Sequence, residues 1–67
     1  MSIMLKDFIK LLVATSEEIR IFDENDNLLF KGEKTDLLDL LSKKQTFAIR
    51  KIFTFYFINN TFYIVVE

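Results

Sequence analysis

The segment Ile52–Ile58, which reads Ile-Phe-Thr-Phe-Tyr-Phe-Ile, most constrains how this chain can fold. A β-strand sends alternate side chains to opposite faces of its sheet. A one-layer sheet in a chain of 67 residues can bury only one face against its own helices. We therefore expect one set of these side chains in the core and the other against a second subunit or a target. The first set is Phe53, Phe55 and Phe57, and the second is Ile52, Thr54, Tyr56 and Ile58.

The chain is short enough to form one domain, residues 1–67. A core of this size rarely supplies more than about 3–5 kcal/mol of stability. Without cysteine there are no disulfides or thiolate metal sites, and without histidine a zinc site is not expected. Dense packing or a partner chain must therefore supply any further stability.

Two segments have the pattern of helices. Residues 3–13 place apolar side chains at helical spacing, with Ser2 in position to cap them. Residues 36–42 form a second leucine-rich stripe, with Thr35 as the expected cap. The strands are expected at residues 17–23, 28–31, 46–58 and 61–67. The predicted order is α-β-β-α-β-β.

Two turns connect the predicted strands into hairpins. Residues 24–27 (Glu-Asn-Asp-Asn) favour a turn, and Asn59-Asn60 fits a two-residue hairpin loop with positive φ. The strand at residues 46–58 is too long for its neighbour, so either a bulge shortens it or its first half extends beyond the sheet. We expect a bend near Arg50 and Lys51, where two adjacent charges break the apolar pattern. The predicted fold is α+β, a four-stranded antiparallel sheet with two short helices on one face.

The usual catalytic side chains are missing. Without His or Cys, the chain cannot form Ser-His or Cys-His nucleophile pairs. Residues 23–27 match the start of a calcium-binding EF-hand loop, but Leu28 and Lys34 replace the required Gly and Glu. We expect no enzyme, no metal site and no cofactor.

Charge is unevenly distributed although the net charge is only −1. Acidic residues outnumber basic ones over residues 17–39, and basic residues follow from Lys43 onward. The acidic hairpin and the aromatic strand are the candidate protein-binding surfaces. Their candidate contact residues are Glu17, Glu18, Asp23, Glu24, Asp26, Phe53, Phe55, Tyr56 and Phe57.

The N-terminal segment does not have the pattern of a signal peptide, because Asp7 and Lys10 interrupt its apolar stretch. The uncharged runs of the chain are also too short to span a bilayer. A cytoplasmic location, without membrane contact, is therefore expected.

Residues 5–9, 19–25, 28–33 and 59–64 together resemble a group of small uncharacterised proteins encoded by phages and integrative elements of low-GC Gram-positive bacteria. The resemblance implies a biological context, that of mobile genetic elements, and it gives no catalytic residues to carry over to this chain. Proteins of this kind often bind a host protein stoichiometrically, and inhibitors of bacterial defence, including anti-CRISPR proteins, are one such class.

Three hypotheses follow, from different functional classes. The first is a non-enzymatic protein-binding module, a phage or mobile-element accessory that binds and inhibits a host protein. The second is a structural homodimerisation domain, with a homodimer formed through the sheet face or the edge of the aromatic strand. The third is a nucleic-acid binder that uses Lys43, Lys44, Arg50 and Lys51, which the net charge disfavours.

Overall fold

The computed structural model describes residues 3–12 and 18–67, which form three helices and four strands. In chain order the elements are α1 (Leu5–Leu11), β1 (Glu18–Phe22), β2 (Leu28–Gly32), α2 (Lys34–Lys43), α3 (Gln45–Ala48), β3 (Ile52–Ile58) and β4 (Thr61–Val66). The fold is α+β, with short helices and one sheet. The expected cap Ser2, the helix end at Val13 and the strand start at Glu17 lie outside the described residues.

The sheet is mixed, and the prediction of a fully antiparallel sheet is wrong. Its strand order is β2-β1-β4-β3. The two hairpins, β1–β2 and β3–β4, are antiparallel, but β1 and β4 are parallel and meet in the centre. Alternation of apolar side chains is the same for either strand direction, so the sequence pattern could not distinguish the two arrangements.

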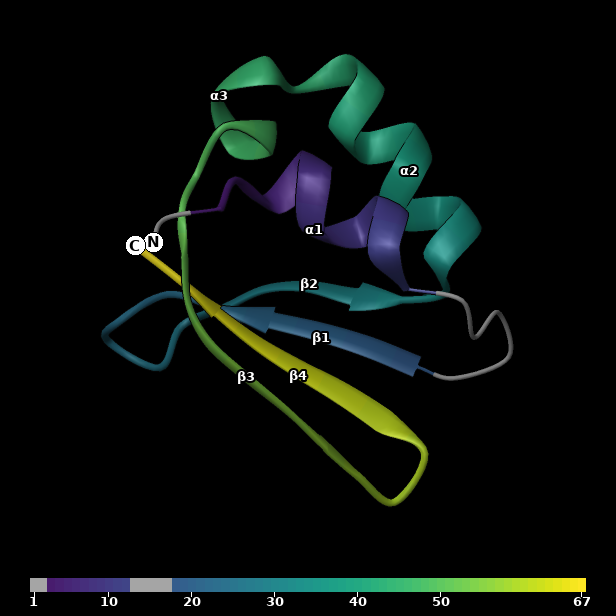
Figure 1. The fold of residues 1–67 in the computed structure, drawn as a ribbon, viewed down its shortest axis with the longest axis vertical. Coiled ribbons are helices and arrows are strands. Elements are labelled where there is room, and N and C mark those ends of the chain that lie inside the picture. Colours follow the sequence, from purple (N-terminus) through teal and green to yellow (C-terminus); the bar gives the residue numbers. More distant parts are fainter. Residues whose placement is uncertain (1–2, 13–17) are drawn as a thin grey trace.

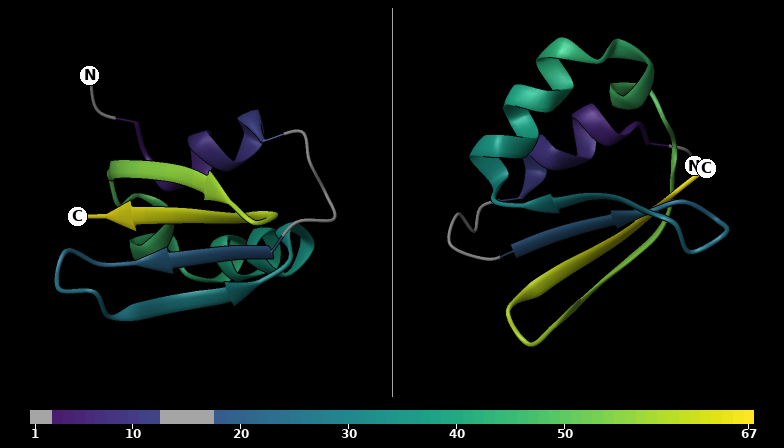
Figure 2. Two further views of the ribbon diagram at one scale, coloured as in Figure 1. Left: turned by 90° about the horizontal axis from the view of Figure 1, so that it is seen from below. Right: turned by 180° about the vertical axis from the view of Figure 1, so that it is seen from behind.

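The three described helices gather on one side of the sheet, and none of them crosses its other side (Figures 1 and 2). The core lies between these two layers. Its strand contribution comes from alternate positions of the two central strands, and its helix contribution comes from α1, α2 and one residue of α3. The buried apolar residues are Leu5, Phe8, Ile9, Ile19, Ile21, Leu37, Leu41, Ala48, Ile64 and Val66.

The long strand predicted for residues 46–58 is also wrong in its first half. Gln45–Ala48 is a single helical turn, α3, in which Ala48 is buried and Phe47 packs against the core. The strand begins at Ile52, directly after Arg50 and Lys51. The described residues therefore form three helices, where the sequence pattern predicted two.

The predicted cap of α2 is wrong as well. The helix begins at Lys34, so Thr35 lies inside its first turn, and the capping position is Glu33, which makes no side-chain capping bond. The hairpin turn at Asn59-Asn60 is confirmed, since the two residues have φ angles of 52° and 59°. Asparagine tolerates this left-handed conformation better than most residues do.

Candidate functional site

Strand β3 is an edge strand that leaves most of its side chains exposed. It pairs with β4 on one side, and no other described segment pairs with the outer side of residues 53–58. Only its start is covered, where Met4 bridges Lys51 and the N–H of Ile52 donates to the carbonyl of Ile3, at 2.8 Å. The exposed fractions are 67% for Phe53, 52% for Phe55, 47% for Tyr56, 49% for Phe57 and 51% for Ile58.

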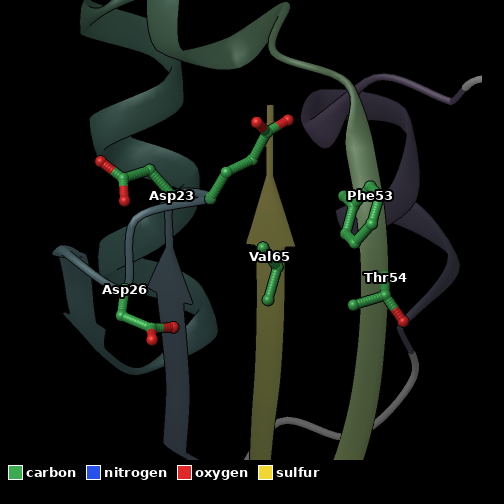
Figure 3. Close-up of a pocket in the computed structure, with 6 residues that line it drawn as sticks. Asp23, Asp26, Phe53, Thr54 and Val65 are labelled. Atoms are coloured by element: carbon green, nitrogen blue, oxygen red, sulfur yellow. The ribbon is translucent and has the colours of Figure 1, made fainter.

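A β-bulge at Phe53 changes which side chains share a face. Ile52 pairs with Val66 and Thr54 with Val65, so Phe53 is the extra residue of β3. Ile52 therefore packs against the core, while Phe53 lies beside Thr54 over the helix-free side (Figure 3). The predicted grouping of Phe53 with Phe55 and Phe57 is wrong, because a bulge reverses the alternation of side chains.

The outer backbone of β3 offers free hydrogen-bonding groups at two residues. The residues that flank a two-residue hairpin loop form a hydrogen-bonded pair, and such pairs then alternate with non-hydrogen-bonded ones. Ile58 and Tyr56 accordingly direct their N–H and C=O toward Thr61 and Tyr63 of β4. Phe55 and Phe57 direct theirs away from the sheet. We call residues 53–58, with these outward groups, the β3 edge.

On the helix side, the rings of Phe55 and Phe57 are only partly covered. The Phe8 ring of α1 contacts Phe55 at a centroid distance of 4.7 Å and an angle of 51°. Phe57 packs on Phe62 of β4 at 4.6 Å and 49°. Both rings are thus held in place by neighbours while about half of each stays accessible. Rigid, half-exposed aromatic rings are typical of binding surfaces.

The helix-free side of the sheet, which we call the open face, carries a row of three stacked rings. Tyr63 stacks on Tyr56 with centroids 5.0 Å apart and on Phe22 with centroids 6.3 Å apart. Arg20 places its guanidinium carbon 5.8 Å from the centroid of Tyr63. The row therefore connects β3, β4 and β1 across the parallel junction of the sheet.

Arg20 is itself fixed by an ion pair. Its Nε donates to Oε2 of Glu18 at 2.6 Å, and this hydrogen bond raises the pKa of Arg20 above its ordinary value. Lys31 of β2 lies directly opposite Arg20 and so shares the open face. The charged strand residues of the open face therefore lie on β1 and β2, beside Phe22 and Leu28, whereas β3 and β4 contain no charged residue.

A hollow of about 390 Å³ opens at one end of the open face. Figure 3 shows Asp23 and Asp26 on one side of it, Phe53 and Thr54 on the other, and Val65 between them. Its volume is at the lower end of the range for small-molecule sites. The acidic turn thus lies at the same end of the sheet as the start of β3.

Asp23 has a structural role in this turn. One carboxylate oxygen accepts the backbone N–H groups of Asn25 and Asn27 at 2.8 and 3.0 Å, and the other accepts Nδ2 of Asn27 at 2.9 Å. These bonds, the side-chain bond from Asn27 first, hold the pKa of Asp23 below its ordinary value. Within the described ranges, no three His, Cys, Asp or Glu residues are placed to hold a metal ion.

The structure does not bring the predicted contact residues together on one surface. Glu17 lies outside the described residues, and Glu18 and Asp23 are engaged within the chain. Glu24 and Asp26 are exposed on the turn. Tyr56 and Phe53 lie on the open face, and Phe55 and Phe57 lie on the helix side.

The basic residues of the nucleic-acid hypothesis are likewise distributed. Lys43 pairs with Asp39 at 3.0 Å on α2. Lys44 and Arg50 border a second hollow together with Leu29, Leu40 and Phe47. Lys51 lies at the start of β3, bridged to Met4.

The predicted contact residues omit several residues of the open face, among them Arg20, Phe22 and Tyr63. Their alternation with Ile19, Ile21 and Ile64 was visible in the sequence and predicts that they point away from the core. The sequence pattern does not show that β1 and β4 are neighbours. Their pairing brings the Phe22 and Tyr63 rings together.

Of the described helices, none combines the length and apolar character needed to cross a membrane. Comparison with known proteins finds no protein-family model, no curated protein and no solved structure that matches this chain.

Proposed function

We propose that this chain is a small non-enzymatic protein-binding module that takes up an extended segment of a partner protein along the β3 edge. One observation carries the proposal, namely that β3 combines outward N–H and C=O groups at Phe55 and Phe57 with half-exposed rings at the same residues. Strand addition uses these two features together, since main-chain bonds supply affinity and side-chain contacts supply specificity.

Beyond its bulge at Phe53, the β3 edge lacks the charged residues and prolines that normally prevent strand pairing. Edge strands are usually protected by Lys, Pro or inward-pointing charges. The segment Ile52–Ile58 has no charged residue and no proline. An exposed edge of this kind favours association.

The partner segment should be extended and apolar at alternate positions. Its main chain would exchange hydrogen bonds with Phe55 and Phe57, and every second side chain would pack on their rings beside α1. A second copy of this chain fits this edge poorly. Helix α1 lies alongside β3 (Figure 2), and symmetric edge pairing would bring the two α1 helices toward the same space. The proposed occupant is therefore a segment of another protein.

The resemblance to phage and integrative-element proteins suggests what such binding would achieve. A mobile-element accessory that adds to an exposed strand of a host protein occupies a surface that the host protein needs. Inhibition of a host protein is in this view the consequence of strand addition, with no chemistry required.

The test begins with a display library of random twelve-residue peptides, selected on the immobilised protein. Selected peptides should contain alternating apolar residues, and binding should slow hydrogen exchange at the amides of Phe55 and Phe57. The decisive pair of variants is Phe57→Ala and Phe57→Pro. Both variants lose the ring of Phe57, but only the proline variant also loses the outward N–H. An edge strand tolerates proline at a position where this N–H faces solvent.

We expect peptide affinity to fall about 10-fold further in Phe57→Pro than in Phe57→Ala, in line with the loss of about 1.4 kcal/mol for one backbone bond. Circular dichroism of both variants confirms that they fold. Equal affinities for the two variants, or exchange protection outside β3, would refute strand addition at this edge.

A further inference from the structure

We propose that the open face is the interface of a homodimer, in which two copies pack sheet against sheet about a two-fold axis parallel to the strands. This inference uses the surface opposite to α1 and goes beyond the binding of a partner at the β3 edge. The dimer would have two partner-binding edges, because packing of the open faces leaves both β3 edges accessible.

The apolar area of the open face fits a second copy. Leu28 of β2 pairs with Phe22, so it joins this face, where it is 52% exposed. With Phe53, Tyr56 and Ile58 it gives four large side chains that are 47–67% exposed, around the partly covered Phe22, Tyr63 and Val65. Because aromatic side chains carry about 150–250 Å² each, the apolar surface is on the order of 500 Å² per chain.

This apolar patch is at the upper end of what monomers expose, about 300–600 Å². With its polar rim, two open faces would bury on the order of 1,400 Å² in total, within the range of stable interfaces. Two packed sheets also lie about 10 Å apart, which two layers of side chains such as these would fill.

The charges of the open face determine the direction of the axis. The aromatic half lies on β3 and β4, and the cations Arg20 and Lys31 lie on β1 and β2. A two-fold axis parallel to the strands, between β1 and β4, reverses the strand order in the second copy. Each aromatic half then faces a half with cations, and Tyr56 meets the strand that carries Lys31, which favours cation–π contact.

The same axis brings opposite charges together at the end of the sheet. The acidic turn and the start of β3 lie at one end, as the hollow between them shows. The two-fold rotation leaves each end of the sheet where it was and exchanges the β2 edge with the β3 edge. Glu24 and Asp26 of one copy therefore approach Lys51 of the second copy. An axis perpendicular to the strands at the level of the stacked rings would instead place Arg20 against Arg20 and Lys31 against Lys31 of the second copy. Complementary charge therefore favours the strand-parallel axis.

The test is sedimentation velocity over about 1–500 µM protein, with dissociation constants for wild type and two matched variants. Tyr56→Lys places a charge in the interface, and Leu38→Lys changes a similarly exposed apolar residue, 42% exposed on α2. We expect a wild-type dimer with a micromolar dissociation constant, weakening of about 100-fold or more in Tyr56→Lys, and less than about 3-fold change in Leu38→Lys.

A charge exchange tests the axis. Glu24→Lys and Lys51→Glu should each weaken self-association about 10-fold, and an equimolar mixture of the two variants should associate more strongly than either alone. A wild-type monomer throughout the series, or a dimer that Tyr56→Lys leaves intact, would overturn the proposal. Failure of the mixture to associate would overturn the strand-parallel axis. Peptide binding by a Leu28→Lys variant, which places a charge on the open face but lies on β2, reports on the β3 edge separately.

Discussion

Tyr56 and Tyr63 lie directly opposite each other on β3 and β4, with their rings 5.0 Å apart and within 11° of parallel. Tyr63 in turn stacks on Phe22, so the edge hairpin is connected to the first hairpin through one central ring. The open face is thus ordered before any partner arrives, which lowers the entropic cost of binding there.

The first prediction concerns this stack. Tyr63→Leu removes contacts to two rings and to Arg20, whereas Tyr56→Leu removes contact to one. We expect Tyr63→Leu to lower the free energy of unfolding more, and a double-mutant cycle to give a coupling of about 0.5–1.5 kcal/mol. Urea unfolding of the two single variants and the double variant measures it. Leu38→Ala is the control, and additive effects would contradict the stack.

The second prediction concerns the β3–β4 turn. Asn60 has a φ of 59°, where alanine carries a steric cost of about 1–2 kcal/mol and glycine does not. Asn60→Ala should therefore lower the free energy of unfolding by about 1 kcal/mol, and Asn60→Gly should raise it by about 0.5 kcal/mol. Thermal or urea unfolding separates the two variants. The same loss from both substitutions would show that the Asn side chain, and not its φ, matters here.

Local patterns were sufficient for the parts of the fold that depend on local chemistry. The Asn59-Asn60 hairpin follows from the tolerance of asparagine for positive φ. The mixed sheet did not follow, since the pairing of β1 with β4 joins residues far apart in sequence. The helical turn at Gln45–Ala48 was missed because Thr46, Phe47 and Ile49 have side chains typical of strands, and packing of Phe47 and Ala48 decided otherwise.

The sequence predicted which residues of β3 belong to the candidate surface, but not on which face of the sheet each of them lies. The sequence identified Tyr56 and the three phenylalanines of β3 as surplus apolar residues, and all four are half-exposed or nearly so. It could not assign them to faces, because one bulge at Phe53 reverses the alternation. The length of the predicted strand allowed for a bulge but did not give its position. Phe22 and Tyr63 become part of the surface only through strand order.

The third prediction is the absence of salt-sensitive nucleic-acid binding. Lys43 is paired with Asp39, and Lys44 and Arg50 border a hollow that shares no lining residue with the hollow of the open face. With a net charge of −1, the chain offers few phosphate contacts. Fluorescence anisotropy with single-stranded and duplex oligonucleotides should show no binding at physiological salt. Micromolar affinity that falls steeply with added salt would reveal counterion release and would support the nucleic-acid hypothesis instead.

The last prediction concerns acid stability and the turn at Asp23. Because the side chain of Asn27, then the backbone of Asn27 and Asn25, donate to its carboxylate, the pKa of Asp23 lies below the ordinary value of 3.8. A carboxyl group whose pKa is lower in the folded chain than in the unfolded chain stabilises the fold. This contribution is complete at a pH above the pKa of the unfolded chain, and it is lost as the pH falls through the pKa of the folded chain. Wild type should therefore exceed Asp23→Asn in melting temperature by a constant amount above about pH 5, and the difference should shrink below about pH 4.

Asp26→Asn is the matched control for this prediction, because it removes a carboxylate of the same turn and asparagine tolerates the φ of 64° at that position. The melting temperatures of Asp26→Asn and wild type should fall in parallel below pH 4, while that of Asp23→Asn should fall less steeply. Melting curves between about pH 2 and pH 7 give all three profiles. A wild-type profile parallel to that of Asp23→Asn would mean that the three hydrogen bonds to Asp23 do not favour its ionised form.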